Sequence, residues 1–276
     1  MLTVLQTALE VGLIYGLVAL ALFISFSILN IADLSTDGCF TLGCAVGAML
    51  TIAGHPILAL FAAMAAGMLS GYVTAFLQTR LGVESILAGI ISNTGLYTIN
   101  LAVMGFSSNV SITGVDTVFS LFKGLVGGQW SRLILLALIA AVIVIVLIRF
   151  FGTSLGLSIR ATGDSLDMVS ASSINPKATI TIGLCLANAL TALSGCLIGE
   201  YNKFCDINLG TGMVTIALAS LIIGEVFAGH RGGVGKRIVC VVLGSIVYRF
   251  IIALALRLNI SAEYFKLVSA VIVAVA

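Results

Sequence analysis

The sequence has few charged residues, only two prolines and only two histidines. Charged residues make up 9% of its 276 residues and hydrophobic residues 60%, whereas a soluble domain has about 25% charged residues. A soluble fold of this length could not bury so much apolar surface, because surface area grows nearly as fast as mass. We therefore expect lipid around most of the chain. The net charge of +2 is dispersed, so the sequence also lacks the basic patch of a nucleic-acid-binding protein.

The sequence also lacks motifs for catalysis or metal binding. His55 and His230 lie in turns beside proline or glycine, and there is no HExxH motif and no plausible Ser–His–Asp order. The segment 229–237 (GHRGGVGKR) is one residue too long for a phosphate loop, and Arg237 stands where Ser or Thr must hold magnesium. We interpret this segment as a tight cytoplasmic turn and expect a non-enzymatic chain without a cofactor of its own.

The six cysteines form no CxxC pair. Five of them lie in apolar stretches, where free cysteine behaves as a small buried hydrophobe. Only Cys205 lies in a polar stretch, so we expect its thiol alone to be accessible to solvent.

Long continuous apolar runs fill most of the chain. About 20 apolar residues span the hydrocarbon core, and lipid favours helices because every backbone polar group must be satisfied internally. We expect one transmembrane domain over residues 1–276, an all-α polytopic bundle of about eight or nine spans. The expected helices cover 3–29, 38–53, 57–79, 84–104, 131–150, 178–200, 211–228, 237–258 and 264–276. The second and seventh are short, and the chain end cuts the last one.

Two parts of the chain share a pattern of a short helix, a polar turn and a long helix. They cover residues 37–81 and 211–258, and they run in opposite directions in the expected topology. Such a pair is typical of a transporter with an inverted repeat, whose halves would be about 1–130 and 178–276. Glycines spaced as GxxxG favour close helix packing. These pairs are Gly12/Gly16, Gly43/Gly47, Gly67/Gly71 and Gly195/Gly199.

A polar break, residues 30–38 (NIADLSTDG), interrupts the first apolar region. Ionisable groups inside a membrane are costly and often functional. The break is either a discontinuous helix near a translocation path or an ordinary loop at the membrane surface. On the first interpretation, the candidates for lining the path are Asn30, Asp33, Thr36 and Asp37.

Other polar residues interrupt apolar helices farther along the chain. The amides Asn93, Asn100 and Asn188 lie in the middle of expected helices, where they either form interhelical hydrogen bonds or line a polar path. Glu225 lies late in the seventh helix and either reaches the interface or pairs with a cation. Of these, Asn93, Asn188 and Glu225 join the path candidates.

The distribution of cations gives an orientation. Placing the loops 150–177 and 229–237 in the cytoplasm puts more lysines and arginines inside than outside. This arrangement predicts an outside N-terminus and an inside C-terminus.

Three segments, residues 156–164 (GLSIRATGD), 168–175 (MVSASSIN) and 193–199 (LSGCLIG), follow one another along the chain. They resemble the GxxIRAxGDN loop and the AARxxGIN and LSGxLAG stretches of the permeases of bacterial ABC importers for branched-chain amino acids and ribose. Residues 28–34 and 222–233 are similar to two further family segments. In order and spacing these pieces cover the chain from about residue 8 to its end. Ser165 and Glu225 depart from the family pattern and point to a branch that resembles permeases paired with lipoprotein receptors for aromatic amino acids.

The resemblance implies a set of partners in the bacterial cell membrane. Two permease chains, identical or different, would form the path, and two ATP-binding chains would hold ATP and magnesium. An extracellular binding lipoprotein would deliver the solute. The competing hypothesis is a stand-alone ion-coupled secondary transporter, in which Glu10 or Asp33 would couple to ions.

The resemblance also implies that the loop 150–177 contacts the ATPase through a short coupling helix near 164–173. Asp164 or Ser165 can cap such a helix, Met168 and Val169 offer an apolar patch to a partner groove, and Pro176 would end it. The alternative is a simple connecting loop. The candidate coupling residues are Arg160, Thr162, Gly163, Asp164, Ser165, Met168, Val169, Ser172, Asn175 and Pro176.

Overall fold

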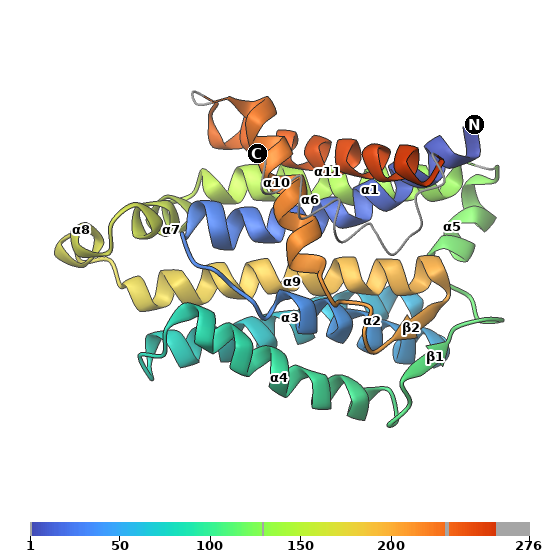
Figure 1. Ribbon diagram of the computed structural model, residues 1–276, viewed down its shortest axis with the longest axis horizontal. Helices are drawn as coiled ribbons and strands as arrows, with labels where there is room; N and C mark the ends of the chain where they lie inside the picture. The colour runs from blue at the N-terminus through green and yellow to red at the C-terminus, as the bar shows by residue number, and fades with distance from the viewer. Residues whose placement is uncertain (1, 129, 230–231, 258–276) are drawn as a thin grey trace.

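The computed structural model describes residues 2–128, 130–229 and 232–257, and it is a bundle of helices (Figure 1). Among these residues, six helices are long and apolar enough to cross a membrane, and two further apolar helices are shorter. This confirms the expected all-α polytopic bundle. The expected helix at 264–276 lies outside the described residues.

The bounds of the expected helices agree with the structure to within a few residues. The long helices are α1 Leu2–Leu22 with its π-helical continuation η1 Phe23–Ile28, α3 Pro56–Thr79, α4 Ser85–Val103, α6 Ser131–Phe151, α9 Pro176–Asn202 and α11 Val234–Arg257. The two short ones are α2 Thr36–Ile52 and α10 Met213–Ala228. Smaller elements are α5 Val118–Val126, α7 Ser154–Asp164, α8 Leu166–Ala171 and the strands β1 Asn109–Ser111 and β2 Phe204–Asp206.

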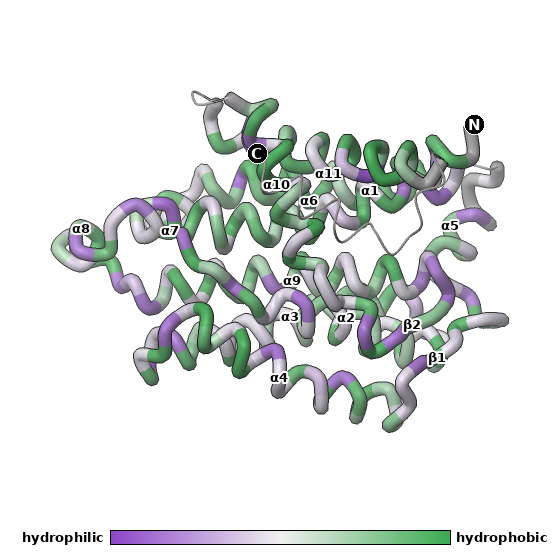
Figure 2. Tube along the Cα trace, viewed as in Figure 1, coloured by the Kyte–Doolittle hydropathy of each residue, from purple (hydrophilic) through white to green (hydrophobic). Residues whose placement is uncertain are grey.

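The long helices lie side by side along the long axis of the molecule, which gives the bundle two distinct ends (Figure 1). One end carries α7 and α8, and the other carries α5 and the antiparallel pair β1–β2. Hydrophobic residues predominate along the helices, and hydrophilic residues are concentrated in the segments at the two ends (Figure 2). We call these the α7/α8 end and the α5/β1 end.

Helix α9 is the centre of the bundle. Within its apolar window 83% of the residues are buried, compared with 22% for α6 at the periphery. Glycines let the neighbouring backbones approach closely: a Cβ atom at Gly43 on α2 would overlap the carbonyl of Ala192, and one at Gly71 on α3 would overlap that of Leu184. The GxxxG pairs of α2 and α3 thus pack on α9, as their spacing predicted.

Helices α2 and α10 both begin in the interior of the bundle. Helix α2 runs along the bundle to the α5/β1 end, whereas α10 runs obliquely across the bundle, away from that end, to the start of α11 (Figure 1). The start of α2 lies beside the middle of α9, where the Cys39 thiol donates to the carbonyl of Asn188 at 3.3 Å. The units α2–α3 and α10–α11 therefore run in opposite directions, as expected. That they are copies of one repeat stays a prediction.

The prediction for Cys205 was wrong. Its side chain is 0% exposed, because the segment around it is the strand β2, which pairs with β1 and packs on Cys44 and Ile112. The pairing of two segments some 95 residues apart has no local signal in the sequence, and the short helices α5 and α7 were not expected either.

Candidate functional site

The polar break before α2 lies inside the bundle and not at the membrane surface. Asn30 takes a left-handed backbone conformation (φ 56°) directly after η1 and turns the chain back into the bundle. Asp33 is 3% exposed, and its carboxylate accepts from the backbone N–H of Ser35 at 2.8 Å, from the Ser35 hydroxyl at 2.6 Å and from Nδ2 of Asn188 at 2.9 Å. The hydroxyl of Thr36 donates to the carbonyl of Asp33 at 3.1 Å. These bonds fix the start of α2 to the middle of α9.

Asp37, in the first turn of α2, also caps the start of α10. Its two carboxylate oxygens accept from the backbone N–H groups of Gly212 at 2.9 Å and Val214 at 3.0 Å. Nearby, the N–H of Gly210 donates to the hydroxyl of Thr41 at 3.1 Å. The first N–H groups of a helix have no partner within the helix, and they carry the positive end of its dipole. One carboxylate therefore lies between the N-termini of two half-length helices.

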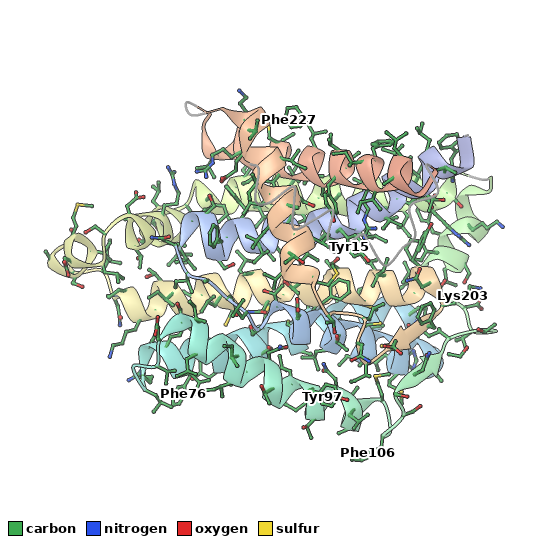
Figure 3. All side chains as sticks on the ribbon, in the orientation of Figure 1. Tyr15, Phe76, Tyr97, Phe106, Lys203 and Phe227 are labelled. Carbon is green, nitrogen blue, oxygen red and sulfur yellow. The ribbon has the colours of Figure 1, made fainter. Side chains whose placement is uncertain are left out.

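A polar cavity of about 320 Å³ opens beside this carboxylate. Its lining comes from the start of α2, the middle of α4 and the connection that leads into α10. The lining residues are Asp37, Gly38, Thr41, Asn93, Thr94, Tyr97, Asn100, Ile207, Asn208 and Thr211. We call it the Asp37 cavity; Tyr97 marks its place about halfway along α4 (Figure 3).

The three mid-helix amides divide between the two roles left open by the sequence. Asn188 forms an interhelical bond to Asp33, whereas Asn93 lines the cavity. Asn100 does both, because its Nδ2 donates to the carbonyl of Gly38 at 3.0 Å and it also lines the cavity. The buried Oδ1 of Asn100 has no hydrogen-bond partner among the described residues.

The path candidates therefore fall into three places. Asp37 and Asn93 meet at the cavity, while Asp33, Thr36 and Asn188 form a buried network next to it. Glu225 lies at the far end of α10, and Asn30 is exposed near the end of η1. Sequence reasoning missed Asn208 and Thr211, because the connection 207–211 looks like an ordinary loop in the sequence. It also missed Thr41, Thr94 and Tyr97, which lie within α2 and α4.

Glu225 pairs with a cation, which is one of the two roles expected for it. Its Oε1 accepts from Nη2 of Arg237 at 2.5 Å and from the hydroxyl of Ser27 at 2.6 Å. Nη2 of Arg237 also contacts the Ser27 hydroxyl at 2.5 Å, and its guanidinium lies 5.0 Å from the ring centre of Phe23. This Arg237 cluster joins η1, the end of α10 and the start of α11 at the α7/α8 end.

The loop 150–177 contains two short helices that pack against the end of η1. Ser165 caps α8 as predicted, its hydroxyl accepting from the N–H of Met168 at 3.4 Å. The hydroxyls of Thr162 on α7 and Thr179 on α9 lie 2.8 Å apart. Gly163 lies so close to η1 that a Cβ atom there would overlap the carbonyl oxygen of Ile28. The loop is therefore in direct contact with the π-helical segment that precedes the polar break.

Two expectations for this loop need correction. Met168 is 58% exposed but Val169 only 1%, because Val169 faces the chain's own bundle; the other exposed large apolar side chain of α8 is Leu166. Pro176 does not end the coupling helix, since α8 ends at Ala171. Pro176 is instead the first residue of α9, a position where its missing N–H costs nothing. Asn175 caps that helix by accepting from the N–H of Lys177 at 3.0 Å, and Arg160, Asp164 and Ser172 are exposed.

Two buried carboxylates lie toward the α5/β1 end, and each accepts hydrogen bonds from neighbouring groups. Glu10 accepts from Nε2 of Gln6 and from the hydroxyl of Tyr201, both at 2.9 Å. Glu200, which sequence reasoning missed, accepts from the hydroxyl of Thr51 at 3.1 Å and the N–H of Val118 at 2.8 Å. Both groups tie elements of the bundle together.

Comparison with known proteins agrees with this architecture. The family model described as the permease component of the branched-chain amino acid transport system matches residues 4–276. A tyrosine transport system permease protein of Clostridioides difficile (strain R20291) is 32% identical over 263 residues, which cover 95% of this chain and 86% of that protein. An uncharacterised protein of Rickettsia prowazekii (strain Madrid E) is 32% identical over 272 residues, 98% of this chain and 95% of that protein. No solved structure matches the chain.

Proposed function

Because the chain belongs to the family of permease components of branched-chain amino acid transport systems, and so is a multi-pass membrane component of such a system, we propose that it forms one of the two permease chains of an ABC importer. Separate chains hydrolyse ATP, and an extracellular binding lipoprotein delivers the solute. The chain itself contributes the path and the contact with the ATPase.

The Asp37 cavity is the observation that supports a path through this chain. Asp37 is only half-buried, although it lies where two half-length helices begin in the interior of the bundle. Irregular backbone and an ionised side chain at membrane depth are tolerated only against protein or a water-filled space. Half-helices whose N-termini meet near the midplane are typical of solute sites in transporters. The cavity is the part of the described structure that best fits the path.

The pair α7–α8 is the proposed contact for the ATPase. It projects from one end of the bundle (Figure 1), and Leu166 and Met168 on α8 are both more than half exposed. An exposed apolar patch on a short helix suits a groove in a partner. On this proposal the α7/α8 end faces the cytoplasm, and the α5/β1 end faces the binding lipoprotein.

The proposed solute is an amino acid, and an aromatic one in particular. The support is the relative named as a tyrosine transport system permease, which is 32% identical over nearly the whole chain. An ion-coupled secondary transporter is less well supported. Glu10 and Asp33, its candidate coupling groups, are both buried and already accept two or three hydrogen bonds from neighbouring side chains and backbone.

The test uses the chain reconstituted in liposomes with the ATPase and the lipoprotein encoded beside it. We expect uptake of L-tyrosine to require ATP. Met168→Asp should abolish stimulation of the ATPase by the loaded lipoprotein, because it places a charge in the apolar contact. Leu81→Asp is the matched control, since Leu81 is 62% exposed and belongs to the connection between α3 and α4, which lies at the same end. Gradient-driven uptake by this chain alone would contradict the proposal, and equal effects of the two variants would contradict the assignment of α8.

A further inference from the structure

The Asp37 cavity has a balance of charge that suits one kind of solute. We propose that it binds a zwitterionic amino acid within the permease itself, with the ammonium group against Asp37 and the carboxylate on the amides of Asn93 and Asn208. This inference rests on the proposed function and adds to it a recognition site that is separate from the binding lipoprotein.

The first argument is electrostatic. Asp37 contributes one negative charge, and the N-termini of α2 and α10 each contribute about half a positive charge. Apart from Asp37, the lining consists of amides, hydroxyls, a phenol, a glycine and an isoleucine, none of them ionised at neutral pH. The charges within the lining are therefore close to balanced, and a zwitterion leaves them balanced. The neighbouring Asp33 carboxylate lies outside the lining, where it is buried and accepts from Ser35 and Asn188. A solute with net charge would add an uncompensated charge at membrane depth, which is costly.

The second argument concerns hydrogen-bonding capacity. The carboxylate of Asp37 lines the cavity and accepts from the N–H groups of Gly212 and Val214. Asn100, which lines the cavity and is 1% exposed, has its Oδ1 without a partner among the described residues. A buried acceptor in that state is energetically unfavourable. A donor such as an ammonium group, bound next to Asp37, is the kind of ligand that would satisfy it.

The third argument concerns the other end of the solute. The amides of Asn93 on α4 and Asn208 before α10 supply N–H donors for a carboxylate, and both line the cavity. Tyr97 adds an aromatic ring to the lining, against which a side chain can pack. The volume of about 320 Å³ is at the lower end of the range for small-molecule sites, so the cavity suits a single amino acid.

The experiment measures binding to the purified complex of permease and ATPase, without the lipoprotein, by ligand-observed NMR. The probes are L-tyrosine (zwitterion), tyramine (cation) and N-acetyl-L-tyrosine (anion). We expect L-tyrosine to bind at least about 10-fold more tightly than either charged analogue. Equal binding of the three probes, or no binding of L-tyrosine, would overturn the inference.

Variants identify the side chains involved. Asn93→Ala and Asn208→Ala should each weaken binding of L-tyrosine by about 10-fold, as expected for the loss of one hydrogen bond to a charged group. The matched control is Asn202→Ala, an exposed asparagine at the end of α9 and outside the cavity. Unchanged affinity in both cavity variants would overturn the proposal.

Asp37→Asn gives an independent readout, because it leaves the site with a net positive charge. In the fraction that elutes as folded protein, we expect the binding preference to shift from L-tyrosine toward N-acetyl-L-tyrosine. An unchanged order of preference would contradict the role of Asp37.

ATP-dependent uptake in liposomes is measured separately. If uptake needs ATP but these variants bind normally, only this inference fails; if uptake does not need ATP, the proposed function fails.

Discussion

Asn188 is the residue that holds the polar break against the central helix. Its Nδ2 donates to Asp33 at 2.9 Å and also to the carbonyl of Leu184 at 3.2 Å, one turn earlier on α9. Asp33 in turn holds Ser35, directly before α2. The Asn188 amide therefore helps to hold in place a half-length helix whose first turn carries Asp37.

We expect Asn188→Leu to lower the free energy of unfolding by about 1–3 kcal/mol, because it leaves the buried Asp33 carboxylate short of one donor. The measurement is thermal unfolding of the purified chain in detergent. Thr191→Val is the matched control on the same helix, since the buried Thr191 hydroxyl donates, among the residues that the structure describes, to the carbonyl of Ala187 on its own helix. Equal stability of the two variants would contradict the role given to Asn188.

At the scale of elements, α10 is held at both of its ends. Asp37 caps its start beside the cavity, and the Arg237 cluster holds its end to η1 and α11. Gly163 on α7 packs on the carbonyl of Ile28, directly after Ser27 of that cluster. The contacts thus run without interruption from the proposed ATPase contact through η1 and α10 to the Asp37 cavity.

Arg237→Gln should weaken the coupling between the loaded lipoprotein and the ATPase but change the stability of the chain only slightly. The side chains of Arg237 and Glu225 are 31% and 36% exposed, and ion pairs of such exposure contribute at most about 1 kcal/mol, so the melting temperature should fall only slightly. In the complete transporter we expect the ATPase to be less dependent on the loaded lipoprotein, because α10 is no longer tied to η1. The measurement is the ratio of stimulated to basal ATPase activity.

Lys236→Gln is the control for that experiment. It removes the same charge at the adjacent residue, whose side chain is exposed. A stimulation ratio that is equally changed in both variants would assign the effect to surface charge and not to the Arg237 cluster.

At the scale of the whole molecule, continuous apolar runs were enough to predict the long helices and the two short ones. Lipid leaves few alternatives to a helix for such runs, which is why their bounds, such as α6 at 131–151, agree closely with expectation. The polar segments were harder to predict. The pairing of β1 with β2, which buries Cys205, depends on tertiary contact between distant loops.

The candidate site was predictable only in part, for the same reason. Asp37 and Asn93 stand out as polar residues in apolar surroundings. Asn208 and Thr211, by contrast, lie in a connecting segment that mixes polar and apolar residues, so nothing local distinguishes them. They belong to the cavity because α10 begins in the interior of the bundle and brings the preceding connection with it.

The orientation of the whole molecule leads to the last prediction. Ser107 precedes β1 and so belongs to the α5/β1 end, and Ser172 directly follows α8 and so belongs to the α7/α8 end; both are exposed. If the α7/α8 end faces the cytoplasm, a membrane-impermeant maleimide added to right-side-out membrane vesicles should label Ser107→Cys but not Ser172→Cys. Opening the vesicles should expose Ser172→Cys to the reagent as well.

The native cysteines should add little background to this labelling. Five of the six are buried, Cys205 among them, and Cys185 is partly buried within α9. The unsubstituted chain should therefore react little with a polar reagent, because its thiols are out of contact with water. The reverse pattern, with Ser172→Cys labelled in sealed vesicles and Ser107→Cys protected, would invert the orientation. Since ATP is supplied from the cytoplasm, that result would also exclude α8 as the contact for the ATPase.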